Sequence, residues 1–293
     1  MSYSKDEFAR TIRHRIQHLD DLPTIPEAAR ALLRLRNNPL AGAQDLAAVV
    51  EQDPSLAAQI VRYARLSIFG YGGKVTSVQK AVTLVLGFDM ALHMALGLAA
   101  GNRLNMPEGG RIGREAFWRH AVYSATLMQE FSTAMPAAIR PPAGLTYLSG
   151  LLHNLGFVTL SHLSPDEFIL LNQLFSESGA HSTREFELQL LGVRHEQLGM
   201  WLMQAWDLPE EVIVTAREHH YSDYDGRHCV YSKLALLADR ALARHDLGDG
   251  NNGELPREVL VSLGLTETWV LAMLEKLFTI SSELDSLVEQ LAA

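Results

Sequence analysis

The polar pair His153 and Asn154 interrupts an otherwise apolar, helical stretch from Tyr147 to Leu160, in which Gly150 and Gly156 are expected to break the helix. Buried polar side chains are unfavourable unless they find partners, so the pair predicts a polar cluster or a ligand site. Five further residues on separate predicted helices could meet it: His120, His195, His219, His220 and Asp239. Imidazole and carboxylate groups are common ligands of transition metals. Three interpretations follow: a metal site, the remnant of one, or polar core.

Helical periodicity dominates the chain, and no run of strict two-residue alternation predicts a strand. The sequence therefore predicts an all-α fold, a bundle of many helices. Helix starts are expected where Thr24 and Glu27 can form a capping box, at Asp53-Pro54, and after Ser77. The helices that carry the candidate ligands are expected over residues 114–134, 195–206, 209–220 and 231–244.

The size and composition of the chain predict a self-sufficient fold. Its 293 residues are 47% hydrophobic, which is enough to bury the core of one large or two ordinary domains. The single cysteine, Cys229, excludes an internal disulfide framework and fits a reducing compartment. The N-terminus has no apolar signal sequence, and the longest apolar run, Ala81 to Ala100, contains Asp89 and His93. We therefore expect a cytoplasmic protein without a membrane span.

The charge of the chain is acidic, with a formal net value of −9. The acidic residues concentrate at the C-terminal end, where positions 249–293 hold eight acidic and two basic residues. Neutralisation of phosphates by Lys and Arg supplies most of the affinity for nucleic acids, and this chain has no such basic stripe. The charge argues against nucleic-acid binding and favours protein or small-molecule partners.

A heptad pattern marks the predicted C-terminal helix. Its apolar positions alternate at spacings of four and three: Met273, Leu277, Ile280, Leu284, Leu287 and Leu291. Such a seam packs either on its own domain or against a second copy of the helix. A homodimer through this helix is one expectation, and packing within the chain is the other.

The order of the candidate ligands resembles the HD superfamily of metal-dependent phosphohydrolases. In this resemblance His153 is the histidine of the namesake doublet, and His120 is the histidine that precedes it. His195 with Gly199 resembles the His-x-x-x-Gly element of the cyclic-di-GMP phosphodiesterase branch, and the remaining matches are His219, His220 and Asp239. The resemblance implies that these residues, with Asn154, hold a divalent metal (Fe, Mn or Zn). The metal would activate water for attack on phosphate.

Three departures from the HD pattern argue against activity. Asn154 replaces the doublet aspartate, and an amide brings only one neutral oxygen to a metal. Phe157 stands where the pattern often has a lysine, and no Gly-Tyr-Pro follows His220. A non-catalytic pocket is expected, with no confident catalytic residue. The alternative is a residual phosphohydrolase or phosphodiesterase acting on a nucleotide or cyclic dinucleotide.

The N-terminal half resembles a more specific family. The stretches Leu22-Pro-Thr-Ile-Pro-Glu27, Asp53-Pro-Ser-Leu-Ala57 and Thr76 to Gly87 are similar to hallmarks of the HDOD domain, the HD-related output domain of bacterial signalling proteins. The resemblance implies a regulatory output module that acts through contact with signalling proteins or through binding of a small ligand such as a nucleotide second messenger. With no receiver or cyclase segment in the sequence, it also implies a stand-alone protein.

The expected division of the chain follows from the span of this resemblance. A helical lead-in covers residues 1–16, and the HDOD domain covers 17–225. Within the domain we expect an N-terminal helical half, 17–106, and an HD-like half, 114–225. A helical extension, 226–293, would complete the chain.

Overall fold

The computed structural model describes residues 5–18, 25–71, 74–101, 106–178, 182–250 and 253–292. These ranges contain helices and connecting segments but no strand, so the all-α prediction is confirmed. None of the helices in the described ranges combines the length and the apolar character that a membrane span requires.

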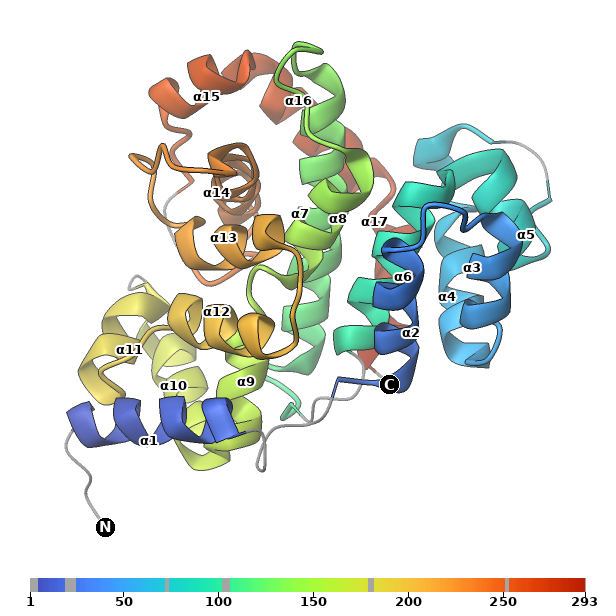
Figure 1. Ribbon diagram of the computed structural model, residues 1–293. Coiled ribbons are helices and arrows are strands. Elements are labelled where there is room, and N and C mark those ends of the chain that lie inside the picture. The colour runs from blue at the N-terminus through green and yellow to red at the C-terminus, as the bar shows by residue number, and fades with distance from the viewer. Residues whose placement is uncertain are drawn as a thin grey trace.

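The N-terminal helices form one side of the molecule (Figure 1). They are α2 (Glu27–Arg36), α3 (Ala43–Val50), α4 (Pro54–Tyr63), the 3₁₀ turn Ser67–Phe69, α5 (Val78–Ala81), a π-helical turn (Val82–Leu86) and α6 (Phe88–Gly101). Helices α2, α3 and α4 pack on α6, which is buried over most of its length. The first helix, α1 (Lys5–His18), lies apart from them and packs on α12.

The remaining helices form the other side of the molecule and surround the candidate site. They are α7 (Arg114–Ala134), α8 (Ala143–Leu152), α9 (Leu155–Leu163), α10 (Pro165–Ser178), α11 (Thr183–Leu190), α12 (His195–Ala205), α13 (Glu210–Glu218), α14 (Cys229–Ala243), α15 (Arg257–Leu263), α16 (Glu267–Thr279) and α17 (Ser281–Ala292). Helix α8 packs on both α6 and α7, so it joins the two sides. The hydrophobic core runs continuously through both sides of the molecule.

Two of the predicted helix starts are formed as expected. The Asp53 carboxylate accepts from the backbone N–H groups of Ser55 and Leu56 at 2.9 and 3.2 Å, and Pro54 opens α4. The Ser77 hydroxyl accepts from the backbone N–H of Lys80 at 3.2 Å. The proposed capping residue Thr24 lies outside the described residues, and α2 itself begins at Glu27 after Pro26.

The predicted helix breaks at Gly150 and Gly156 are wrong. Both glycines lie inside helices, and the chain turns between them, at His153-Asn154. Their role is close packing. A Cβ on Gly156 would come within 1.9 Å of the His195 carbonyl oxygen, and one on Gly150 within 2.6 Å of the backbone of α7.

The C-terminal heptad pattern spans two helices rather than one. Helix α16 ends at Thr279 and α17 begins at Ser281, so the expected continuous helix is interrupted at Ile280. Four of the seam leucines are buried in the chain's own core: Leu277, Leu284, Leu287 and Leu291. Packing within the chain therefore occurs, and dimerisation through this segment stays a prediction.

Candidate metal centre

Each predicted ligand stands at the inner surface of a different helix or at a helix end. His120 lies in the second turn of α7, and His153 and Asn154 form the junction between α8 and α9. His195 is the first residue of α12, and the last turn of α13 leads into the paired histidines. The structure brings all the candidates together in two neighbouring clusters, His120–His153–Asp239 with Asn154, and His195–His219–His220 with an additional residue, Asp249.

The first cluster is a hydrogen-bonded network around Asp239. The carboxylate oxygen Oδ1 of Asp239 lies 3.0 Å from His120 Nε2 and 3.2 Å from His153 Nε2. The Asn154 amide nitrogen lies 3.4 Å from His120 Nδ1, and His153 Nδ1 donates to the Gly150 carbonyl oxygen at 2.7 Å.

The two histidines of the first cluster have opposite pKa shifts. Burial lowers the pKa of His120 to about 4. Burial would also lower the pKa of His153, but the Asp239 carboxylate outweighs it and raises that pKa. Asp239 Oδ2 and Asn154 Oδ1 are buried without a hydrogen-bond partner in the part of the chain that the structure describes.

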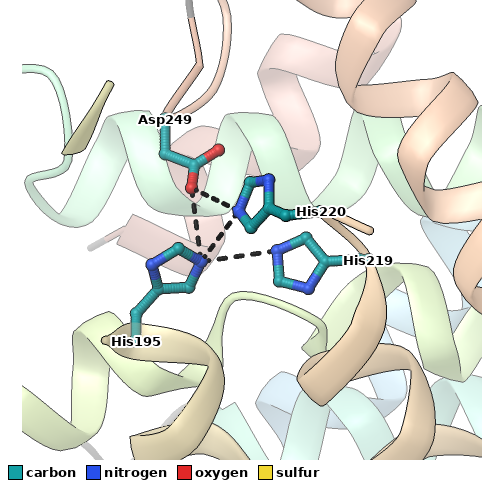
Figure 2. Close-up of side chains that lie close together, drawn as sticks. All are labelled: His195, His219, His220 and Asp249. Atoms are coloured by element: carbon teal, nitrogen blue, oxygen red, sulfur yellow. Dashed lines mark hydrogen bonds and ion pairs between the residues drawn. The ribbon is translucent and has the colours of Figure 1, made fainter. Parts of the chain in front are cut away.

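The second cluster gathers three imidazole nitrogens and one carboxylate oxygen (Figure 2). His195 Nε2 lies 3.3 Å from His219 Nε2, 3.2 Å from His220 Nε2 and 3.3 Å from Asp249 Oδ2. His220 Nε2 lies 3.1 Å from the same oxygen. Burial would raise the pKa of Asp249, but the histidines, His220 foremost, outweigh it and hold that pKa well below its ordinary value.

A buried carboxylate orients His195 toward the cluster. Glu187, on α11, is 1% exposed and accepts from the His195 backbone N–H at 3.1 Å and from Nδ1 at 2.8 Å. Glu196 lies next to the same ring and pairs with Arg184 at 2.7 Å. Burial would lower the pKa of His195, but Glu187 and Glu196 outweigh it and raise that pKa to about 10. The carboxylates of Glu187 and Glu196 therefore make the His195 side of the second cluster favourable for a cation.

The hydrogen bonds fix which ring nitrogens carry hydrogen in the second cluster. His195 Nδ1 donates to Glu187, and His219 Nδ1 donates to the Ala216 carbonyl oxygen at 2.9 Å. In neutral rings the lone pairs of both Nε2 atoms therefore point into the cluster and toward each other. Facing lone pairs beside a carboxylate need a cation between them, either a proton or a metal ion. Ligating histidines usually donate their second N–H to a carboxylate or carbonyl in this way.

The sequence interpretation missed Asp249 and Glu187. Asp249 lies in the loop after α14, inside Gly248-Asp249-Gly250, a sequence typical of a connecting segment. Glu187 lies eight positions before His195 on a helix of mixed polarity. The one available signal was an acidic residue between two glycines shortly after Asp239. Such a signal is common in loops that bind nothing.

Access to both clusters is narrow. The histidines other than His220 are at most 4% exposed. The phenyl ring of Phe157 stacks on His195, with ring centres 4.3 Å apart. A pocket of about 250 Å³ reaches the edge of the clusters at His220, Asp239 and Asp249. The donor set of nitrogens and a carboxylate suits a transition metal, so the residues present fit the divalent metal that the HD resemblance implies.

The comparisons with known proteins show the family of the chain. The family model of the HDOD domain matches residues 22–222. A curated relative from Treponema pallidum (strain Nichols), described as an uncharacterized protein, is 27% identical over 216 residues, or 73% of this chain and 40% of the relative. The solved structure of a candidate signal-transduction protein from Marinobacter aquaeolei VT8 has a TM-score of 0.84 and 32% identity, covering 99% of this chain and 66% of that one.

Two further solved structures match nearly end to end. An HDOD domain protein of unknown function from Geobacter sulfurreducens has a TM-score of 0.73 at 22% identity, over 96% of this chain and 97% of its own. A candidate metal-dependent phosphohydrolase from Shewanella amazonensis SB2B has a TM-score of 0.68 at 21% identity, over 96% and 99%. These two likenesses show the fold. The chain spans less than two thirds of the Treponema and Marinobacter proteins, and the match over residues 22–222 places it in the HDOD domain family.

Proposed function

We propose that this chain is a non-catalytic regulatory module of bacterial signal transduction, acting through contact with signalling proteins or through a small ligand. The observation that carries the proposal is the closed, altered HD pocket. Asn154 brings an amide to the position of the doublet aspartate, and Phe157 covers the His195 ring. The Marinobacter structure, of a candidate signal-transduction protein, supports a signalling role.

The size of the pocket also supports a non-catalytic role. Sites for substrates and cofactors usually enclose about 300–1,000 Å³. The pocket beside His220 is smaller, at about 250 Å³, and Asp239 and Asp249 place negative charge on its wall. A phosphate ester would have to approach these carboxylates. The pocket therefore favours a small ligand or none over a dinucleotide substrate.

The alternative is a residual metal-dependent phosphohydrolase acting on a nucleotide or cyclic dinucleotide. One observation favours it: Arg184 and Arg240 line the same pocket, next to His220. Guanidinium groups are suited to binding phosphate. Arg184, however, already pairs with Glu196 and lies over the Tyr221 ring, which reduces its availability.

A hydrolysis assay distinguishes the regulatory function from the phosphohydrolase function. Protein loaded with Mn²⁺, Fe²⁺ or Zn²⁺ would be incubated with cyclic di-GMP and with bis(4-nitrophenyl) phosphate, beside the His153→Ala variant. The regulatory proposal predicts product formation no faster than in that variant. Turnover that His153→Ala abolishes would overturn the proposal and establish the phosphohydrolase.

A further inference from the structure

Asp249 is a buried carboxylate that a loop brings to the second cluster. It is 2% exposed, and it lies outside residues 22–222, which the family model matches. Its Oδ2 atom faces His195 and His220, whereas Oδ1 is buried without a hydrogen-bond partner in the described part of the chain. Burying a charged group with an unpaired oxygen is costly unless a cation compensates it.

The spacing of the four donors in the second cluster matches one small metal ion. Zinc lies about 2.0–2.1 Å from imidazole nitrogen and carboxylate oxygen, so tetrahedral ligand atoms are about 3.3–3.4 Å apart. Four of the six donor pairs are 3.1–3.3 Å apart, all involving His195 or His220. All four donors lie within 4.8 Å of one another. The four short pairs are therefore already close to the spacing that one tetrahedral ion requires.

We propose that His195, His219, His220 and Asp249 form a closed four-ligand site for one divalent transition metal of the zinc class, with Asp249 supplying the carboxylate that Asn154 lacks. Asp249 reaches the metal from a loop rather than from the doublet position. The first cluster is the weaker candidate, because both ring nitrogens of His120 already have partners, Asp239 and Asn154.

The loop that carries Asp249 is held in place by the protein. The Asp249 carbonyl oxygen accepts from the Thr183 backbone N–H at 3.3 Å and from its hydroxyl at 3.1 Å. Gly248 has φ +103°, and a Cβ there would be 3.1 Å from the His120 ring. The glycine lets the loop lie against the site. A metal on Asp249 would tie this loop to α12 and α13.

Four protein ligands leave no open position for water or substrate, which is the pattern of structural rather than catalytic zinc sites.

The metal site goes beyond the regulatory function proposed above. The proposed site and the proposed function can therefore fail independently of each other. Hydrolysis that persists in Asp249→Asn, by a chain whose wild type binds metal through Asp249, would overturn the function but keep the site. Metal-free protein that neither hydrolyses nor needs metal would overturn the site but keep the function.

The test is metal binding by the whole chain, purified without a histidine tag. We expect elemental analysis after Zn²⁺ loading and dialysis to find one equivalent in the wild type. Asp249→Asn should weaken Zn²⁺ binding by more than about 100-fold, because removing even an outer-shell partner of a ligand typically costs 10–100-fold. The matched control is Asp246→Asn, an exposed carboxylate in the same loop, which should bind like the wild type.

Two results would overturn the site. One is a folded wild type that retains no metal after loading with Zn²⁺, Co²⁺, Mn²⁺ or Fe²⁺. The other is an Asp249→Asn variant with wild-type affinity, above all if Asp239→Asn loses the metal, since the ion would then lie in the first cluster. If Asp249→Asn does not fold, the Co²⁺ spectrum of the wild type decides: four-coordinate absorption supports the site, and six-coordinate absorption contradicts it.

Discussion

At the residue scale, the second cluster depends on the groups that hold its rings. His195 is fixed by two bonds to Glu187, and His219 is fixed by the carbonyl oxygen of Ala216 at the end of α13. These hydrogen bonds turn the Nε2 atoms of His195 and His219 toward the cluster. Glu187 is therefore a positioning residue: it touches His195 and none of the other proposed ligands.

Replacing Glu187 by Gln tests this positioning role. The amide removes the charge behind His195 and allows the ring to turn, so Zn²⁺ affinity should fall by about 10–100-fold while the one-to-one stoichiometry is kept. Titration calorimetry measures both quantities. The control is Glu185→Gln, an exposed residue of the same helix, which should leave binding unchanged. Equal affinities of the two variants would refute the role of Glu187.

Most of the site residues could be predicted from the sequence, but their grouping could not. The histidines and Asp239 stand out because polar side chains interrupt apolar helical segments, and burial makes such residues informative. Asp249 does not interrupt an apolar helical segment, and an aspartate between glycines is ordinary in a loop. Only the path of the chain after α14 brings it to His195 and His220.

At the element scale, the site depends on the close approach of helices. The N-terminus of α9 packs on the start of α12 at Gly156, and α8 packs on α7 at Gly150. These contacts allow His153, at the α8–α9 junction, to lie beside His219, with ring centres 5.0 Å apart. The sequence interpretation treated both glycines as helix breakers, because a glycine in a helical run is locally unfavourable and its packing partner is invisible in the sequence.

A methyl group at position 156 should disturb both stability and the site. In Gly156→Ala the Cβ would overlap the His195 carbonyl oxygen, so α9 and α12 must separate. We expect a loss of unfolding free energy of at least about 1–3 kcal/mol, measured by urea denaturation, together with weaker metal binding. In the control, Gly250→Ala, the added Cβ would have no atom of the described residues within 4 Å, so the change should be nearly neutral. A Gly156→Ala variant as stable as this control would contradict the packing argument.

At the scale of the whole molecule, α17 joins the two sides of the structure. It packs on α7 and also touches α4 (Figure 1). Asp285 pairs with Arg119 of α7 at 3.0 Å, and Ser286 accepts from Arg62 of α4 at 2.8 Å. Residues 226–293, expected as an extension, thus supply Asp239 and Asp249 to the site as well as this joining helix. The HD resemblance indicated Asp239, but it gave no indication of Asp249 or of the joining helix.

Truncating one seam leucine tests the joining role of α17. Leu287 is 1% exposed, so Leu287→Ala should lower the free energy of unfolding by about 2–5 kcal/mol through lost contacts and a cavity. The control is Leu40→Ala, which removes the same atoms from a side chain that is 90% exposed. Chemical denaturation followed by circular dichroism compares the two. Equal stabilities would mean that α17 contributes little to the fold.

The coordination of the bound metal tests the central claim, a closed pocket that cannot activate water, most directly. X-ray absorption at the zinc edge of the loaded wild type reports both the number and the type of ligands. The account predicts four nitrogen and oxygen ligands, with the scattering of three imidazole rings and no change when phosphate is added. A five- or six-coordinate metal, or one whose ligands change with phosphate, would mean an open position and would contradict the account.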